Sequence, residues 1–599
     1  MSERAVRIGN ASGFYGDRIS AMREIVEGGP LDVVTGDYLA ELTMLILWKA
    51  RRKDPSAGYA RTFLVQLEQV LGTALDRGIR IVANAGGLNP AGLAEKIAEL
   101  ATGLGLAPKV AYLDGDDITD RLGTLLDAGH DLTHLDTGRS LRDAGVEPVT
   151  ANAYLGGWGI AAALGEGADI VVCPRVTDAS LVVGPAAWWH GWSRTDYDAL
   201  AGAVAAGHVI ECGPQATGGN YPWPAEILDR RYPGFPIAEV AADGSSVITK
   251  HPDTGGLVSV GTVTAQLLYE IAEPAYANPD VIAHFDTVEL HQEGTDRVRI
   301  SGTAGSAPSG LLKVAIDYLG GYRNTMTLVL TGLDIEGKAA AAEAQLFDVL
   351  GGKDQFEEVD VRLLRFDQVD APSNEQANAH LRITVKDHDR DRVGRRFSNA
   401  TMELALASYA GFHTTTSPGD ASDFGVYWPA LVPAQVITQR LVLPDGTVRI
   451  IEHTAPASSA EPGSVIATTA PGQQVTPGQQ FADGDTVRAP LGLICGARSG
   501  DKGGNANVGL WARSVEEYDW LRSYLSIEAF TALLPEAATL AVRRYELPNL
   551  LALNFVIVGL LGNGVADSTR PDPQAKGLGE YVRSRHVDLP SVFVQQPQG

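Results

Sequence analysis

Short apolar runs alternate with longer amphipathic stretches through the first third of the chain. Ala5–Ile8 and Leu31–Val34 are such runs, each followed by a loop rich in Gly, Asn or Asp, and Tyr38–Ala50 then has apolar positions at helical spacing. The same pattern recurs at Ile79–Ala83, Lys109–Leu113 and Asp169–Cys173. This alternation predicts βαβ units and a mostly parallel sheet whose strands are buried on both faces.

The pattern changes after about residue 245, where β-branched segments become frequent. We expect strands there that continue the sheet in a mixed, more antiparallel way: Val258–Val263, Thr287–Leu290, Arg297–Ser301 and Thr325–Leu330. A helix is predicted over Asn399–Tyr409. The Pro-Asp-Gly turn within Leu443–Gly446 predicts a pair of flanking strands.

The domain boundaries follow from composition. Residues Ala455–Ala489 are rich in Pro, Gly, Ser and Thr, as expected of a linker. The remaining residues, 490–599, have strands and helices of their own at Leu491–Ala497, Val515–Tyr524, Ile527–Leu534 and Asn554–Leu560. We therefore predict an α/β fold with a large domain over 1–454, a linker over 455–489, and a small α+β domain over 490–599.

Composition narrows the classes of partner. The 599 residues carry a net charge of −25, with a pI near 4.9, which argues against binding to nucleic acid or to an anionic membrane surface. The three cysteines have no CxxC spacing, so we expect no disulfide framework. No run approaches the ~18–20 apolar residues that span a bilayer, and we expect a cytoplasmic protein.

Polar side chains follow the predicted parallel strands, where open α/β sheets bind ligands. We expect Asp37 and Asp178 to transfer protons and Arg175 to hold a substrate carboxylate. Further substrate-binding candidates in these loops are Asp17, Arg18 and Asn84. The structural alternative is that Asp and Asn in such loops are helix caps and turn formers.

The segment Gly207–Tyr221 (GHVIECGPQATGGNY) has the most unusual local sequence. Cys212, with His208 nearby, is a candidate nucleophile; the alternative is a small buried hydrophobe. A Gly-rich turn follows, whose backbone amides we expect to stabilise an oxyanion or bind a carboxylate: Thr217, Gly218, Gly219 and Asn220.

The C-terminal domain opens with LGLICGARSGDKGGNANVGLWAR, which predicts a strand, a polar loop and a second strand. Four residues of the loop are candidates to bind a carboxylate or phosphate: Arg498, Ser499, Asp501 and Lys502. The alternative is a structural hairpin with an ion pair. The Gly/Asn-rich loop Leu561–Gly577 could meet this segment from a neighbouring strand.

The segment Gly157–Ala162 matches GxGxxA, and Asp178 lies about 20 residues beyond it, as in a dinucleotide fingerprint. The preceding VTANAYL is a poor central strand, so close helix packing is the competing interpretation of these glycines. No P-loop motif and no metal-ligand spacing is present, and we predict no metal site.

Several of these strings resemble one protein family. GNASGFYGDR, VTGDYLAELTM, NAGGLNP, GADIVVCPRVTDASL and ECGPQATGGNY are similar to the N-terminal domain of the acyclic terpene utilisation (AtuA-type) proteins. ARSGDKGGNANVGLWAR resembles the ferredoxin-like domain that follows it in that family. The resemblance implies a role in the catabolism of citronellol, geraniol and related branched acyl chains, beside biotin-dependent acyl-CoA carboxylases, but it supplies no catalytic residues.

Three hypotheses follow from the residues and the resemblance together. The first is an enzyme that acts on a branched or terpenoid acyl substrate by lyase-type or hydratase-type acid/base chemistry, with no cofactor except CoA as part of the substrate. The second is a non-catalytic partner subunit in an assembly with an acyl-CoA carboxylase. The third is a nicotinamide or flavin enzyme that uses Gly157–Ala162. We expect a homo-oligomer in each case.

Overall fold

The computed structural model describes residues 4–415, 417–457 and 485–594, which form two compact units. Unit 1 comprises Met1–Asp317, Tyr427–Val565 and Gln574–Gly599; unit 2 comprises Tyr318–Val426 and Ala566–Pro573. The sequence did not indicate a separate unit 2. Most of the predicted linker lies outside the described residues, and its end forms strand β21 (Thr486–Pro490).

The core of unit 1 is an eleven-stranded mixed sheet whose central strands are parallel. In spatial order, these central strands are β1 (Val6–Asn10), β2 (Val33–Gly36), β3 (Arg80–Ala83), β6 (Ile170–Val172) and β4 (Val110–Asp114). Each overlaps a predicted apolar run, and the prediction of a parallel core is confirmed.

Antiparallel strands extend this sheet on both sides, which confirms the predicted mixed continuation, except that the predicted strand Thr325–Leu330 lies in β14 (Leu311–Thr331) of a different sheet. Beyond β1 lie β7 (Pro236–Val240), β8 (Ser246–Lys250), β12 (Arg297–Ser301) and β11 (Glu289–Gly294). Beyond β4 lie β19 (Gln439–Val442) and β20 (Val448–Ile451), the strand pair predicted around the Pro-Asp-Gly turn.

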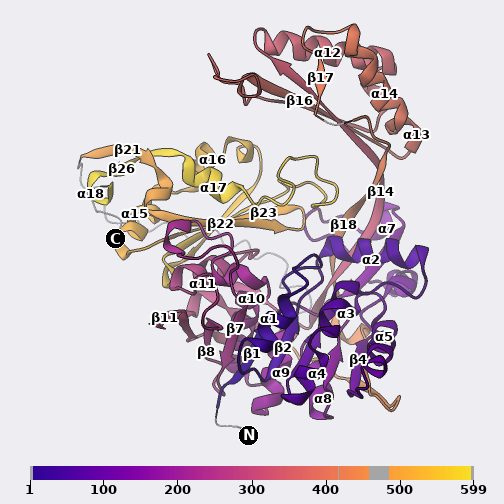
Figure 1. Ribbon diagram of the computed structural model, residues 1–599, viewed down its shortest axis with the longest axis vertical. Helices are drawn as coiled ribbons and strands as arrows, with labels where there is room; N and C mark the ends of the chain where they lie inside the picture. The colour runs from indigo at the N-terminus through magenta and orange to yellow at the C-terminus, as the bar shows by residue number, and fades with distance from the viewer. Residues whose placement is uncertain (1–3, 416, 458–484, 595–599) are drawn as a thin grey trace. The chain divides into compact units, whose positions relative to one another are not determined.

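Helices of unit 1 accompany this sheet (Figure 1). They include α1 (Ala21–Glu27), α2 (Glu41–Lys53), α3 (Arg61–Glu68), α4 (Leu71–Asp76), α5 (Pro90–Gly103), α8 (Trp158–Gly165), α9 (Ser180–His190) and α10 (Tyr197–Ile210). Phe63 and Ile97 are fully buried in the same cluster as Val34 and Ile81. No helix within the described ranges is long and apolar enough to cross a membrane.

The strand predicted over Val258–Val263 is wrong, because this segment begins helix α11 (Val260–Leu267). The Ser259 hydroxyl accepts a hydrogen bond from the Thr262 amide at 3.2 Å, and the Thr262 hydroxyl accepts one from the Ser259 amide at 3.0 Å. This reciprocal capping box supplies partners for amides at the helix start. It outweighs the β-propensity of the valines.

Unit 2 is a smaller sheet covered by helices on one face. Its strands are β15 (Glu358–Leu364), β16 (Asn378–Asp387), β17 (His413–Thr414) and the later part of β14 (Leu311–Thr331). Leu328 and Ile383 lie in one buried cluster with residues of α12 (Ile335–Leu350) and α14 (Arg395–Glu403). Helix α14 corresponds to the helix predicted over Asn399–Tyr409, but it begins and ends earlier in the chain than predicted.

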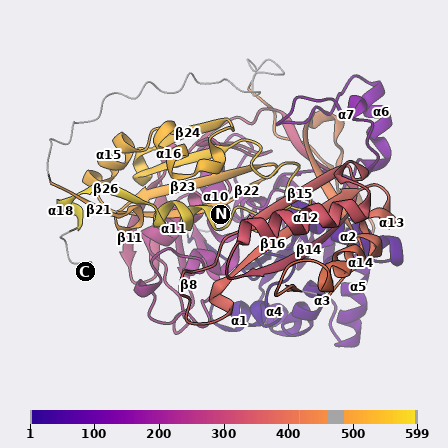
Figure 2. The ribbon, with the colours of Figure 1, turned by 90° about the horizontal axis from the view of Figure 1, so that it is seen from above.

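The C-terminal region of unit 1 is a small α+β domain, as predicted. Its antiparallel strands, in spatial order, are β22 (Cys495–Lys502), β23 (Asn505–Ala512), β25 (Ala552–Ile557) and β24 (Val542–Leu547). Helices α15 (Val515–Tyr524) and α16 (Ile527–Leu533) lie along this sheet (Figure 2), where Phe530 stacks on Phe555 with ring centroids 4.0 Å apart. The candidate residues Arg498 to Lys502 lie on β22 rather than in a loop.

Candidate active site

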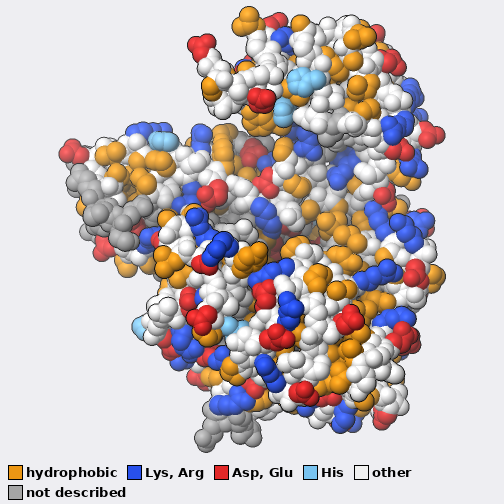
Figure 3. Space-filling view, in the orientation of Figure 1, with side chains coloured by type: hydrophobic (Ala, Val, Ile, Leu, Met, Phe, Trp, Pro, Cys, Tyr) orange, Lys and Arg blue, Asp and Glu red, His pale blue; other side chains and the backbone are white. Residues whose placement is uncertain are grey.

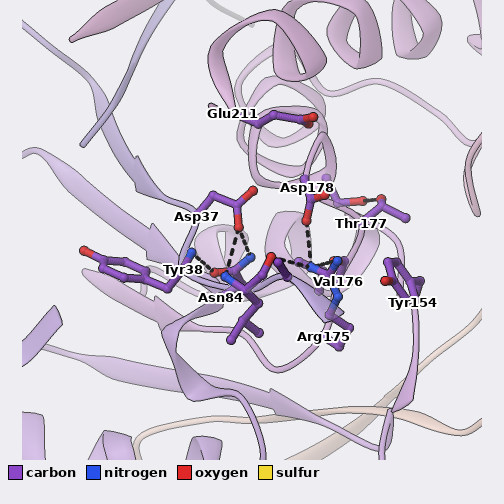
Figure 4. A network of polar contacts seen from close by, with 12 residues as sticks. Asp37, Tyr38, Asn84, Tyr154, Arg175, Val176, Thr177, Asp178 and Glu211 are labelled. Carbon is purple, nitrogen blue, oxygen red and sulfur yellow. Dashed lines mark hydrogen bonds and ion pairs between the residues drawn. The ribbon is translucent and has the colours of Figure 1, made fainter. Parts of the chain in front are cut away.

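The carboxyl ends of β2, β3 and β6 bring together polar residues that are far apart in the sequence (Figure 4). Asp37 follows β2 and Asn84 follows β3. The Asn84 side-chain amide donates to Asp37 Oδ1 at 2.6 Å, while its carbonyl oxygen accepts from the Tyr38 amide at 2.7 Å. Asn84 therefore fixes the orientation of the Asp37 carboxyl.

Arg175 and Asp178, in the loop after β6, form an ion pair. The distance from Arg175 Nη1 to Asp178 Oδ1 is 2.7 Å, and the guanidinium lies 4.2 Å from the centroid of the Tyr154 ring. The Arg175 side chain is 3% exposed and that of Asp178 is 30% exposed. A buried cation thus holds a carboxylate that solvent and small molecules can reach.

Glu211, which the sequence analysis did not select, supplies a third carboxyl to this group (Figure 4). It immediately follows α10, and the Asn10 side-chain amide donates to the carbonyl oxygens of Ile210 and Glu211 at 2.7 and 2.8 Å. The end of β1 thereby fixes the end of α10. Glu211 lies in the segment Gly207–Tyr221, directly before the candidate nucleophile Cys212. An acidic residue next to a buried helix end was the signal that could have identified it.

We call Asp37, Asp178, Glu211 and Arg175 the carboxyl cluster. Burial raises the pKa of Asp37 well above its ordinary value, and the charge of Asp178 raises it further. Burial, with the charges of Asp178 and Glu270, does the same to the pKa of Glu211. Burial therefore favours the protonated forms of Asp37 and Glu211, which can donate a proton, beside Asp178, which is ion-paired with Arg175.

Further charged residues surround the cluster. Lys313 Nζ lies 3.6 Å from Glu41 Oε1. Burial opposes ionisation of Glu41, but Lys313 and Arg175 outweigh it and lower its pKa to about 2. Burial raises the pKa of Glu270 to about 7, despite Lys502 nearby. Acids of very different strength thus share one neighbourhood, a common property of acid/base active sites.

Strand β22 of the C-terminal domain contributes to this neighbourhood. Lys502 lies 5.5 Å from the centroid of the Tyr276 ring, and its pKa is lowered by burial and by Lys313. Burial and the charge of Glu270 raise the pKa of Asp501 to about 8. Arg498 donates a hydrogen bond to the Gln215 side chain and lies 4.3 Å from the Tyr269 ring centroid. Three of the four β22 candidates therefore lie near residues of the N-terminal domain.

Ser499 has a structural role instead. Its hydroxyl accepts from the Gly579 amide at 2.9 Å and donates to the Lys576 carbonyl at 3.1 Å. These bonds join β22 to the start of α17 (Leu578–Ser584) within the C-terminal domain.

Asp17 and Arg18 also form local structure. Asp17 Oδ2 accepts from the Gly13 amide at 2.9 Å. Arg18 pairs with Glu24 at 2.5 Å and lies 4.5 Å from the Phe235 ring centroid. The turn-forming interpretation of this loop is the one that its contacts favour.

In the Gly-rich turn, the amides of Gly218 and Gly219 already have acceptors and are not free to bind an oxyanion. The amides of Gly218 and Gly219 donate to the carbonyls of Gln215 and Pro214, at 3.3 and 2.8 Å. The Thr217 hydroxyl donates to the Pro214 and Gly234 carbonyls. The turn lines a pocket that includes none of the carboxyl cluster, and the pocket's residues are Gly218, Gly219, Asn220, Tyr221, Pro224, Ile227, Arg230 and Pro233.

Cys212 lies beside Glu211, but its surroundings do not activate it. Burial raises the pKa of the Cys212 thiol well above its ordinary value, and the charges of Glu211 and Glu270 raise it further. The thiolate is the nucleophilic form, so this environment works against nucleophilic catalysis. The raised pKa of the thiol favours a structural cysteine.

The glycines of Gly157–Ala162 serve packing. The preceding strand β5 (Pro148–Ala153) pairs with β14 and not with the parallel sheet. The Gly157 amide donates to Asp280 Oδ2 at 2.6 Å, so a buried carboxylate occupies the helix start that a pyrophosphate would need. The structure does not favour the dinucleotide interpretation. Within the described ranges, no group of three His, Cys, Asp or Glu side chains is placed to hold a metal ion.

Comparison with known proteins identifies the family. Residues 6–443 match the family model described as acyclic terpene utilisation family protein AtuA, and residues 489–588 match the AtuA ferredoxin-like domain. Neither the curated proteins nor the solved structures gave a match. The first match spans well over half of the chain, so the protein belongs to the acyclic terpene utilisation family and carries that family's ferredoxin-like domain at its C-terminal end.

Proposed function

We propose that this protein is an enzyme that adds water to, or removes it from, a branched acyl chain of the terpenoid type, presented as a CoA thioester. The observation that carries this proposal is the carboxyl cluster, in which burial favours the protonated forms of Asp37 and Glu211 beside Asp178, which pairs with the buried Arg175 and is 30% exposed. Membership of the acyclic terpene utilisation family supports the substrate class.

The reaction needs one base and one acid, and the cluster supplies both. In the hydration direction, Asp178 takes a proton from water, whose oxygen bonds to the β-carbon of the enoyl thioester. Glu211 or Asp37, whose protonated forms are favoured by burial, then delivers a proton to the α-carbon. One water molecule is consumed, and the carboxyls exchange their protonation states through solvent.

Charge near the cluster suits the intermediate of this reaction. Negative charge develops on the thioester oxygen while the α-carbon awaits its proton. Lys313 is 30% exposed and lies close to Glu41, while Lys502 faces the same group of acids from β22. We infer that these ammonium groups, in place of the backbone amides of Gly218 and Gly219, stabilise the enolate.

The experiment is turnover by the purified full chain with a 3-methyl-branched 2-enoyl-CoA and with the corresponding 3-hydroxyacyl-CoA. We expect mass spectrometry to show gain or loss of one water. Asp178→Asn removes the base while keeping the shape of the side chain. Asp229→Asn is the matched control, because Asp229 lies at the surface and pairs with the exposed Arg231.

Two outcomes would contradict the proposal. Equal activity of Asp178→Asn and wild type would exclude Asp178 from the chemistry. Failure to convert either thioester, combined with co-purification of biotinylated subunits, would favour the partner-subunit hypothesis. Cleavage of a carbon–carbon bond would keep the acid/base cluster but change the reaction class from hydration to that of a carbon–carbon lyase.

A further inference from the structure

The sheet of unit 2 has one apolar face and one polar face. Along β16, Leu381, Ile383 and Val385 belong to the buried cluster that includes residues of α12 and α14. The alternate residues Arg382, Thr384 and Lys386 therefore point to the opposite face. This polar face contains no residue of the carboxyl cluster.

Arginines are crowded on the polar face. Arg382 on β16 stands directly opposite Arg362 on β15, and Arg323 on β14 is close enough to affect its pKa. Burial, with the charges of Arg362 and Arg323, lowers the pKa of Arg382. Like charges directly opposite each other across two strands destabilise a sheet. We call Arg323, Arg362 and Arg382 the arginine face.

The nearby carboxylates form their ion pairs with cations other than Arg382, although the charge of Asp360 also acts on Arg382. Asp360 pairs with Arg362 at 2.7 Å. Glu358 and Asp567 both pair with Lys386, at 2.9 and 2.7 Å. Among the residues that the structure describes, Arg382 has no hydrogen-bond or ion-pair partner, and it is half-buried. The protein has a net charge of −25, so acidic side chains outnumber basic ones. Figure 3 shows acidic and basic side chains interspersed over the visible surface.

A loop from the C-terminal part of the chain borders the arginine face. This loop, Ala566–Pro573, belongs to unit 2 and lies within the Leu561–Gly577 segment that the sequence analysis singled out. Arg362 Nη2 donates to the Thr569 hydroxyl at 3.3 Å, and Arg323 Nη1 donates to the Ser568 carbonyl at 3.4 Å. The Thr569 hydroxyl accepts from Arg362, so its own hydrogen can be donated to a ligand.

We propose that the arginine face, with the Thr569 hydroxyl at its border, binds a phosphate group, either a monoester or a diphosphate, of a small ligand. Guanidinium groups bind phosphate oxygens through paired hydrogen bonds, and a bound dianion would offset the repulsion between Arg362 and Arg382. Coenzyme A carries both kinds of phosphate, so a CoA thioester is one source of this group and a free nucleotide or pyrophosphate is the other.

Calorimetric titration of the full chain with pyrophosphate, coenzyme A and pantetheine tests the proposal. We expect pyrophosphate or coenzyme A to bind, pantetheine to bind more weakly than coenzyme A, and Arg382→Gln to weaken phosphate-dependent binding by about ten-fold or more. Arg395→Gln is the matched control, because Arg395 is exposed on α14, at the helix-covered side of the sheet. It should leave the affinity unchanged.

Each result has a definite meaning. Binding of coenzyme A alone that is sensitive to Arg382 would identify a phosphorylated thioester as the source, and binding of pyrophosphate alone would identify a free phosphate ligand. No binding of either probe, or binding that Arg382→Gln leaves intact, would overturn the proposal. Hydrogen exchange of the β15 and β16 amides checks that the variant is folded. No turnover is measured, so failure of the proposed hydration reaction would leave this test unaffected.

Discussion

Two regions of this protein crowd like charges together, and they relieve the repulsion in different ways. In the carboxyl cluster of unit 1, burial and mutual repulsion raise the pKa of Asp37 and of Glu211, so that these groups take up protons. On the arginine face of unit 2, Arg362 and Arg382 remain charged, because a guanidinium does not lose its proton in a protein.

Crowded carboxyls and crowded arginines indicate different functions. Crowded carboxyls store protons, and a group that gains and loses protons near neutral pH suits acid/base chemistry. Crowded arginines can be neutralised only by an anion from outside, which suits binding. Substitutions in each region can test this contrast.

Replacement of Asp178 by Asn should have the largest effect. The variant keeps a hydrogen-bond acceptor for Arg175 but removes the proposed base, so kcat should fall by about 10²- to 10⁴-fold. Steady-state turnover of the branched enoyl-CoA measures this change. The melting temperature should stay near that of wild type, and a collapse of the fold would show that Asp178 acts on stability and not on chemistry.

Arg175→Met tests whether the buried cation holds the cluster together. Removing one partner of a buried ion pair is strongly destabilising. Because Asp178 is partly exposed and can be hydrated again, we expect the free energy of unfolding to fall by about 3 kcal/mol. Tryptophan fluorescence during urea unfolding can follow this, because none of the nine tryptophans lies within unit 2. Arg18→Met, which breaks an exposed pair with Glu24, should cost about 0.5 kcal/mol.

The pH dependence of stability should reveal the buried acids beside the cluster. Burial and the charge of Asp117 raise the pKa of Asp116 to about 7, and Asp116 accepts from the Asn152 side chain at 2.7 Å. A carboxyl whose folded pKa exceeds its unfolded pKa binds more protons in the folded state. It therefore stabilises the fold fully below pH 4, and this contribution is lost as the pH rises through 7.

Asp116→Asn removes this proton uptake and should flatten the profile. Between pH 5 and pH 8, we expect the variant to gain on the order of 2 kcal/mol relative to wild type, as measured by urea unfolding at each pH. Parallel profiles for the two proteins would mean that Asp116 is ionised in the folded state. Such a result would weaken the same argument for Asp37 and Glu211.

Much of the fold could be predicted because local patterns and tertiary structure agree. The apolar runs of the parallel strands are buried on both faces, so their sequence alone shows their role. The exception at Val258–Val263 arose from side-chain capping by Ser259 and Thr262, which a count of β-branched residues ignores. Unit 2 was missed because its boundary at Tyr318 falls inside the continuous strand β14, where no loop or change of composition marks the start of a new unit.

The candidate site was predicted in part for a similar reason. Asp37, Asn84, Arg175 and Asp178 all follow strands of one parallel sheet, and strand order places them at one edge. Glu211 comes from the end of α10, a position that no strand pattern fixes. The oxyanion role expected for Gly218 and Gly219 is not supported, because their amides donate hydrogen bonds to carbonyl oxygens of the same turn. The sequence does not show which carbonyl oxygens accept these bonds.

The smallest predicted effect sharpens the contrast between the two regions most directly. Arg382 opposes Arg362 and has no hydrogen-bond or ion-pair partner among the described residues, so Arg382→Gln should stabilise unit 2 by about 0.5 kcal/mol at low salt without phosphate. Hydrogen exchange of the β15 and β16 amides measures this, since unit 2 lacks tryptophan. Added pyrophosphate should reverse the sign, because it would stabilise wild type more than the variant. A destabilised variant in the absence of phosphate would mean that Arg382 packs usefully against the sheet, and the idea that its charge awaits an anion would then be wrong.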